Sequence, residues 1–246
     1  MSPLVETWEA MPFTLSPIRY TLFPGMLLSI DTCGPAGSIA LARLHNEQVE
    51  ILAEAPLAGK TYSARLIPAI GELLATHHTS VADLSVIVVT KGPGSFTGIR
   101  IGLSAAKGLA EVHGIAILAV SRLQVLAHQA QTQAAALDAS RHEFYFGHYA
   151  GDPREALLAL DAFQAEAATL GQKLAVCEAA VHTTAPGATL VEPPTAADAL
   201  RFALPRLRAR DFDDPVTLDG NYLRRSDAEI FSQPGARRPK GQIRQP

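Results

Sequence analysis

The sequence has few of the features that mark several protein classes. Among its 246 residues only Cys33 and Cys177 are cysteines, and neither has a partner at metal-ligand or redox spacing. A disulfide framework is therefore excluded, and a reducing compartment is the simplest environment. Apolar runs are also short. The densest spans residues 84–89, whereas a membrane helix needs about 18 or more apolar residues in succession, so we expect no membrane segment.

An excess of charge of one sign is missing as well. The chain has 21 Lys and Arg against 24 Asp and Glu, a formal net charge of −3. A broad basic face that neutralises phosphates is not expected, and neither is stable direct binding of nucleic acid. Residues 1–25 lack a basic leader and contain Glu6 and Glu9, which argues against a secretory signal and favours the cytoplasm.

What the sequence does have is a regular succession of strands and helices from residue 26. Hydrophobic residues make up 48% of the chain, enough for an ordinary globular core. In the first half, strands at 26–34, 37–44 and 49–55 should form an antiparallel meander. A helix at 62–77, a strand at 84–90, a helix at 97–113 and a strand at 115–120 follow.

A further helix at 123–136 should end the first unit, and the rest of the sequence predicts a smaller unit with the same kinds of element. Its expected order is a strand pair opening at 144–149, a helix near 157–170, a strand at 174–178, a helix near 196–208 and a closing segment at 221–224. We therefore predict an α/β protein with an N-terminal domain over 26–136 and a smaller C-terminal domain over 137–228. Residues 1–25 and 229–246 are expected to be disordered.

A glycine-rich turn lies between the strand at 84–90 and the helix that follows it. Gly92, Gly94 and Ser95 are at a helix N-terminus, where backbone N–H groups can hold an anion. The segment is not a Walker A loop, because no Lys-Ser/Thr pair follows, and Thr97 replaces the third glycine of G-x-G-x-x-G. Asp31, at the carboxyl end of the first strand, is where α/β proteins often bind ligands. A vestigial nucleotide site at these four residues and a purely structural turn are both open.

The helix at 97–113 carries small residues on one stripe. Gly98, Gly102 and Ala106 are four apart, and each glycine costs a helix about 0.8–1 kcal/mol relative to alanine. Such a cost is usually offset by the close approach of another backbone. The approaching backbone can belong to the same chain or to a second protein.

Other motifs fail. Gly59-Lys60-Thr61 ends like a P-loop, but Glu54 stands where its first glycine should be. His142-Glu143 begins a zincin signature, but Phe146 replaces the second histidine. We therefore expect no catalytic residues, no metal ligands and no peptidase activity.

Several segments together resemble the TsaB (YeaZ) family. They are residues 28–32, the block from Gly92 to Gly102, Val120-Ser121 and Asp138-Ala139, and the resemblance runs from about residue 26 to residue 225. It implies an actin-like ATPase (ASKHA) fold, which is an α/β fold of two ribonuclease-H-like lobes, here with a reduced second lobe. Ser140 and Tyr62 depart from the family pattern, Tyr62 standing where a histidine is common.

The resemblance also implies a function. TsaB is a non-catalytic scaffold that binds and stabilises TsaD in the complex that makes threonylcarbamoyladenosine in tRNA. TsaD and TsaE are the expected partners, and ATP and metal would be bound by them and not by this chain. A homodimer is a further expectation. The alternative function is an ATPase or small-molecule kinase of the same fold, motivated by Asp31 and the glycine-rich turn.

The family resemblance places the contact with TsaD on the two helices of the first lobe. The residues that we assign to this interface are Leu66, Ile70, Leu73, Leu74, Gly98, Ile99, Gly102, Leu103, Ala106 and Leu109.

Overall fold

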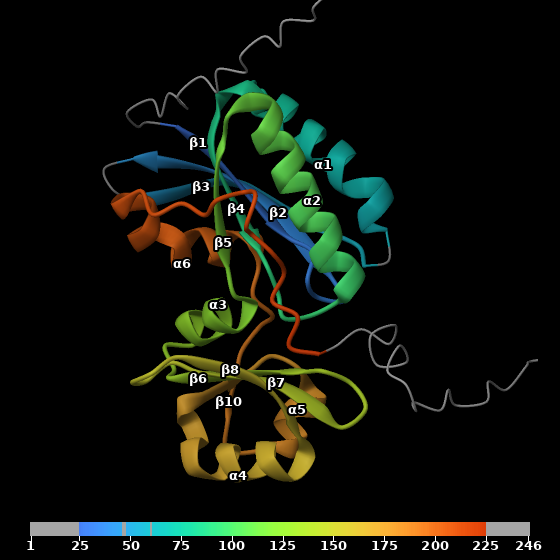
Figure 1. The fold of residues 1–246 in the computed structure, drawn as a ribbon, viewed down its shortest axis with the longest axis vertical. Helices are drawn as coiled ribbons and strands as arrows, with labels where there is room; N and C mark the ends of the chain where they lie inside the picture. The colour runs from blue at the N-terminus through green and yellow to red at the C-terminus, as the bar shows by residue number, and fades with distance from the viewer. Residues whose placement is uncertain (1–24, 46–47, 60, 225–246) are drawn as a thin grey trace, which may run out of the picture.

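The computed structural model describes residues 25–45, 48–59 and 61–224, and within them the chain forms two five-stranded sheets. The sheets lie one above the other along the long axis of the molecule, each with its own helices (Figure 1). The expected α/β class is confirmed. Apart from residue 25, the segments predicted to be disordered, 1–25 and 229–246, lie outside the described residues.

The first sheet has the strand order β3-β2-β1-β4-β5. Strands β1 (Met26–Asp31), β2 (Gly37–His45) and β3 (Gln48–Leu57) form the predicted antiparallel meander, while β4 (Leu84–Thr90) and β5 (Ala116–Val120) run parallel to β1. The parallel strands are buried along almost their whole length. Their continuous apolar runs fit a sheet that is covered on both faces.

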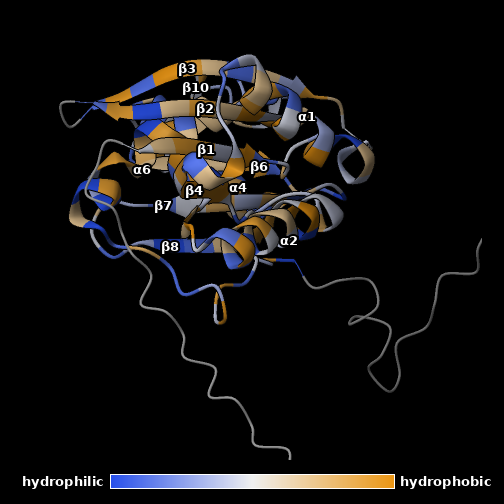
Figure 2. Cartoon of the chain, turned by 90° about the horizontal axis from the view of Figure 1, so that it is seen from above, coloured by the Kyte–Doolittle hydropathy of each residue, from blue (hydrophilic) through white to orange (hydrophobic). Residues whose placement is uncertain are grey.

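Two helices, both predicted, cover one face of this sheet (Figure 1). Helix α1 (Tyr62–Thr76) buries Leu66, Ile70 and Leu74, which recur every four residues. Helix α2 (Phe96–His113) begins at Ser95, whose side chain accepts a hydrogen bond from the Gly98 N–H. Seen from above, hydrophobic and hydrophilic residues alternate around α2 (Figure 2), as they do in an amphipathic surface helix.

The opposite face of the first sheet is covered by α6 (Ala196–Ala209), which comes from near the end of the described chain. This helix contacts all five strands of the first sheet, and its buried alanines and leucines share a core with Leu27 and Val88. Within the range predicted as the C-terminal domain, 137–228, the chain therefore returns to the first sheet after residue 195. The second sheet and its helices are an insertion between two parts of the first lobe.

The second sheet has the order β10-β9-β6-β7-β8. Its strands are β6 (Ala134–Asp138), β7 (Glu143–His148), β8 (Arg154–Ala159), β9 (Leu174–Val176) and β10 (Thr189–Leu190). Strand β6 has an antiparallel meander on one side and parallel strands on the other, as β1 has in the first sheet. The two sheets therefore share one topology. The short 3-10 helices are η1 (Val81–Asp83) and η2 (Gly171–Lys173).

Helices α4 (Leu160–Leu170) and α5 (Ala179–Thr184) pack on one face of the second sheet, and α3 (Arg122–Gln129) packs on the other. Helix α3 therefore lies between the two sheets (Figure 1). We call the first sheet with α1, α2 and α6 the first lobe, and the second sheet with α4 and α5 the second lobe. None of the helices in the described part of the chain is both long and apolar enough to cross a bilayer.

The predicted end of the helix over 123–136 was wrong. Helix α3 stops at Gln129, and Ala134–Asp138 forms the central strand of the second sheet. Alanine favours helices, but Ala134, Ala135 and Ala136 are wholly buried between two layers of helices. At that position sheet pairing outweighs intrinsic propensity. The helix predicted from residue 157 likewise starts later, because Leu157–Ala159 end strand β8.

Candidate functional site

A cavity of about 860 Å³ opens between the two lobes. The first lobe contributes the loop after β1 and the start of α2, and the second lobe contributes the end of β6 with the turn that follows. The segment from Asn221 to Arg224 closes one side. Loops at the carboxyl ends of β1, β4 and β6 therefore meet here, the position where open α/β sheets bind ligands.

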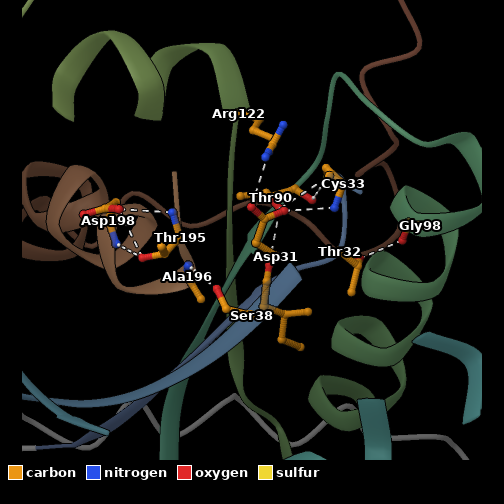
Figure 3. A network of polar contacts seen from close by, with 12 residues as sticks. Asp31, Thr32, Cys33, Ser38, Thr90, Gly98, Arg122, Thr195, Ala196 and Asp198 are labelled. Carbon is orange, nitrogen blue, oxygen red and sulfur yellow. Dashed lines mark hydrogen bonds and ion pairs between the residues drawn. The ribbon is translucent and has the colours of Figure 1, made fainter. Parts of the chain in front are cut away.

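Asp31 lies beneath this cavity and is 1% exposed. Its Oδ1 accepts hydrogen bonds from the Cys33 N–H (2.9 Å) and from the Thr90 hydroxyl (2.7 Å). Its Oδ2 is 3.4 Å from Nε of Arg122 (Figure 3). Both oxygens are engaged and the charge is compensated within the chain. A cation added beside Asp31 would meet the guanidinium of Arg122, so the carboxylate is poorly placed to hold a metal ion.

Arg122 is the first residue of α3 and is 3% exposed. Burial alone would lower its pKa, but the nearby carboxylates, Asp31 foremost, raise it. Glu178, which follows β9 in the second lobe, also acts on Arg122 and lines the cavity. Its Oε2 is buried without a hydrogen-bond partner among the described residues, and burial raises the pKa of this carboxyl. Arg122 therefore pairs with Asp31 of the first lobe, and the charge of Glu178 in the second lobe also favours its protonated form.

The two cysteines lie close to this charged group. Burial raises the pKa of both Cys33 and Cys177 to about 12. The Cys33 thiol also donates to the carbonyl oxygen of Thr90 at 3.2 Å. Both side chains therefore stay protonated at neutral pH, a state in which a thiol is a poor nucleophile.

The glycine-rich turn is explained by contacts within the chain. Gly92 and Gly94 have φ angles of 105° and 156°, a region that side chains rarely adopt. A Cβ on Gly94 would lie 2.2 Å from the carbonyl oxygen of Cys33. Ser95 caps α2 and its N–H bonds to that same oxygen at 2.8 Å. The turn thus fits tightly against the end of β1, and its residue types need no bound anion to explain them.

The structure places most of the predicted interface inside the chain. Eight of its ten residues are buried inside the chain: Leu66, Ile70, Leu74, Gly98, Ile99, Gly102, Leu103 and Ala106. A Cβ would lie 2.0 Å from the Thr32 carbonyl oxygen at Gly98 and 2.4 Å from the Thr32 hydroxyl at Gly102. The Thr32 hydroxyl in turn donates to the carbonyl oxygen of Gly98 at 2.7 Å. The backbone that approaches the small-residue stripe therefore belongs to β1 and its loop. Only Leu73 and Leu109 are partly exposed.

The outward face of the same helices has a different composition. We call it the α1–α2 outer face and define it by Ile67, Gly71, Gly108 and Val112. Ile67 is 54% exposed and Val112 is 76% exposed. Gly71 and Gly108 are exposed, and a Cβ on either would have no neighbouring atom within 4 Å. The stripe at Gly98 and Gly102 did not indicate this face. Gly71 and Gly108, which lie in mid-helix, were a sequence signal that could have done so.

Two of the positions that depart from the family pattern lie in well-defined local structure. Tyr62 is buried, its hydroxyl donates to the Gly34 carbonyl oxygen at 2.9 Å, and burial raises its pKa to about 12. Ser140 begins a turn in which three residues in a row, Ser140, Arg141 and His142, have φ near 60°. Among the described residues, no group of three or more His, Cys, Asp or Glu side chains is arranged to hold a metal.

The paired sheets of one topology, with a cavity between them, define the class of ribonuclease-H-like, actin-like two-lobed proteins. Solved structures agree. One is an uncharacterised Pseudomonas aeruginosa protein described as similar to the peptidase YeaZ, with a TM-score of 0.65, 26% identity, and coverage of 81% of this chain and 100% of that one. A second, YeaZ from the same organism, matches with a TM-score of 0.62 and 23% identity over the same shares of the two chains.

Relatives by sequence are named more specifically. Two proteins called "tRNA threonylcarbamoyladenosine biosynthesis protein TsaB" match, from Haemophilus influenzae (36% identity; 49% of this chain, 52% of that one) and Bacillus subtilis (41%; 50% and 54%). The matched regions thus span about half the length of these curated relatives. An uncharacterised Mycobacterium tuberculosis protein is 31% identical over 82% of this chain and 93% of its own.

A family model described as "TsaD: tRNA N6-adenosine threonylcarbamoyltransferase" matches residues 50–203. The chain therefore belongs to the family that this model describes, and within it to the TsaB (YeaZ) branch.

Proposed function

We propose that this protein is a non-catalytic scaffold subunit in the biosynthesis of threonylcarbamoyladenosine in tRNA, acting in the cytoplasm. It binds a TsaD-type partner through the α1–α2 outer face and stabilises it. TsaE joins the same complex, and ATP and metal are bound by the partner subunits. The names of the TsaB relatives support the pathway, and the composition of the outer face supports the scaffold role.

The observation that carries the proposal is the presence of glycine and large apolar residues on an exposed helical face. Each glycine in a helix costs about 0.8–1 kcal/mol relative to alanine. At Gly98 and Gly102 this cost is offset by close packing on Thr32, but Gly71 and Gly108 have no neighbouring group that would require them. A partner helix that packs closely on this face would supply the missing reason. Ile67 and Val112 would then be buried in the complex.

The groups around Asp31 support the non-catalytic part of the proposal. Asp31 and Arg122 neutralise each other at 3.4 Å. Both nearby thiols are held protonated by burial. A general base or nucleophile needs a free, suitably ionised side chain, and these groups do not provide one.

The test is binding to TsaD from the same host, measured by calorimetry. Gly71→Leu and Gly108→Leu should each weaken binding about tenfold or more, since a leucine would hold the two backbones apart. The matched control is Val216→Asp, because Val216 is 88% exposed and lies outside the α1–α2 outer face. Unchanged affinity in both glycine variants would overturn the proposed interface.

A homodimer through the same face is part of this proposal, since a surface that packs on a similarly folded partner can pack on its own copy. Sedimentation of the isolated protein should show a concentration-dependent dimer that TsaD displaces. A strict monomer at high concentration would contradict the dimer and leave the heteromeric interface to the binding test.

The second candidate is an ATPase or small-molecule kinase, favoured by the 860 Å³ cavity beside Asp31. Calorimetry of the isolated protein with ATP and magnesium separates the two functions. Saturable binding that is lost in Asp31→Ala, in a variant whose folding has been verified, would favour the kinase. We expect no such binding, because Arg122 already compensates Asp31.

A further inference from the structure

Helix α3 starts with two residues that do not serve the helix. Ser121 is the N-cap, yet its side chain makes no capping hydrogen bond, although serine is a preferred cap for that purpose. Arg122 follows as the first helical residue, where the positive end of the helix dipole disfavours a cation. Two neighbouring departures from helix-start chemistry indicate that both side chains are used elsewhere.

Ser121 reaches across to the second lobe. Its hydroxyl donates to Oε1 of Glu155, on strand β8, at 2.5 Å. The Tyr149 hydroxyl donates to the same oxygen at 2.8 Å, and the Asn221 side-chain amide donates to the other carboxylate oxygen. The Glu155 carboxylate of the second lobe therefore bonds to the start of α3, to the residue that follows β7 and to the segment from Asn221 to Arg224. Burial, together with this carboxylate, raises the pKa of Tyr149, which stays a neutral donor.

Two of these donors are held at the first lobe, Asn221 by its own backbone and Ser121 by its neighbour Val120. The N–H of Asn221 bonds to the Lys91 carbonyl oxygen at 2.7 Å, directly after β4. The Lys91 N–H bonds to Val120 at the end of β5 at 2.9 Å, next to Ser121. Next to Ser121, Arg122 pairs with Asp31 of the first lobe at 3.4 Å and lines the same cavity as Glu178 of the second. The hydrogen bonds of Glu155 thus tie the second lobe to the start of α3 and to Asn221.

We propose that Glu155, Ser121, Tyr149 and Asn221 form an interlobe lock that fixes the angle between the two sheets. Within the described residues, the chain crosses between the lobes over 121–133 and 191–195, and its last segment, 221–224, reaches the second lobe, where Arg224 pairs with Glu143. Such narrow connections would allow hinge bending of the lobes. The Glu155 carboxylate, on β8, bonds to two of these connections and opposes that bending. This inference concerns the internal rigidity of the chain and does not depend on the proposed partner.

The test measures the distance between the lobes. Pulsed electron resonance measures it between two spin labels, one at Ala209 and one at Gln164. Ala209 is the exposed last residue of α6, and Gln164 is exposed on α4. The labels are attached in a Cys177→Ser background, and Cys33 is protected from labelling by burial. Glu155→Ala should broaden the distance distribution and raise hydrogen exchange at the Arg122 and Asn221 amides about tenfold. The matched control is Glu166→Ala, which removes a carboxylate that pairs with Arg154 within the second lobe. A distribution of wild-type width in Glu155→Ala would overturn the lock.

Ser121→Ala is a second variant that tests the lock if Glu155→Ala folds poorly. The lock predicts a broader interlobe distance in this variant, with unchanged exchange at the Gln124 and Val125 amides inside α3, because the hydroxyl does not cap the helix. Faster exchange within α3 at an unchanged interlobe distance would show that Ser121 is an ordinary cap and would refute the lock.

Discussion

Helix α2 carries glycine on both of its faces, and the two faces differ in what lies beside each glycine. On the inward face, Gly98 and Gly102 lie against Thr32 so closely that a Cβ would overlap with it. On the outward face, Gly108 has open space around it, as Gly71 has on α1. The inward glycines are explained by the fold of this chain, while no neighbour among the described residues explains the outward ones, which is why we propose a partner there.

Ion pairs also differ between the inward and the outward side of the molecule. Arg122–Asp31 on the inward side and Arg65–Glu72 on the exposed side of α1 have the same N···O distance of 3.4 Å. The side chains of the first pair are 4% and 2% exposed, and those of the second are 53% and 65% exposed. Two ion pairs of equal N···O distance therefore contribute very differently to stability, because solvent screens only the exposed pair.

The largest expected effect is at the inward ion pair. Asp31→Asn leaves the guanidinium of Arg122 buried without its counter-charge, and should lower the free energy of unfolding by about 3–5 kcal/mol. Urea denaturation followed by circular dichroism measures it. Glu72→Gln is the control and should cost at most about 1 kcal/mol. Equal losses in the two variants would show that burial does not separate these pairs.

A smaller loss is expected at the inward glycine. Gly98→Ala places a methyl group 2.0 Å from the Thr32 carbonyl oxygen, so the helix must shift. Overpacking of this kind should destabilise the protein by about 1–3 kcal/mol, measured in the same denaturation experiment. A variant as stable as the wild type would mean that α2 can move away from β1 without cost.

The smallest effect has the opposite sign. Gly71→Ala and Gly108→Ala meet no neighbouring atoms and replace a poor helix former with a good one. Each should stabilise the isolated protein by about 0.5–1 kcal/mol. Thermal unfolding would detect the gain. A loss at either position would show that the outward glycines serve this chain after all, and would remove the main support for a partner on that face.

The sequence allowed much of the first lobe to be predicted, because its signals are local. The helix predicted over 97–113 is α2 to within one residue, and the apolar run at 84–90 coincides with β4. The second lobe was harder, since the alanines of β6 become strand only through burial between helices. The return of α6 to the first sheet could not be predicted from local periodicity.

The site was predicted only in part, for the same reason. Asp31 was identified from its position after a buried strand, but its partner Arg122 is 91 residues away in the chain and carries no motif. Glu155 and Glu178 were missed because their roles depend on how the lobes face each other. The small-residue stripe correctly indicated a close backbone, but nothing in the sequence named Thr32 as that neighbour.

The position of α6 has a consequence for synthesis. About 75 residues separate the end of β5 from the start of α6, and at roughly 5–20 residues per second a ribosome needs about 4–15 s to make them. Throughout this interval the first sheet is complete, but the face formed by Leu27, Ala40, Val86 and Val88 lacks its cover. The nascent chain therefore exposes an apolar sheet for seconds, and the second lobe is made and can fold while the first still waits for its last helix.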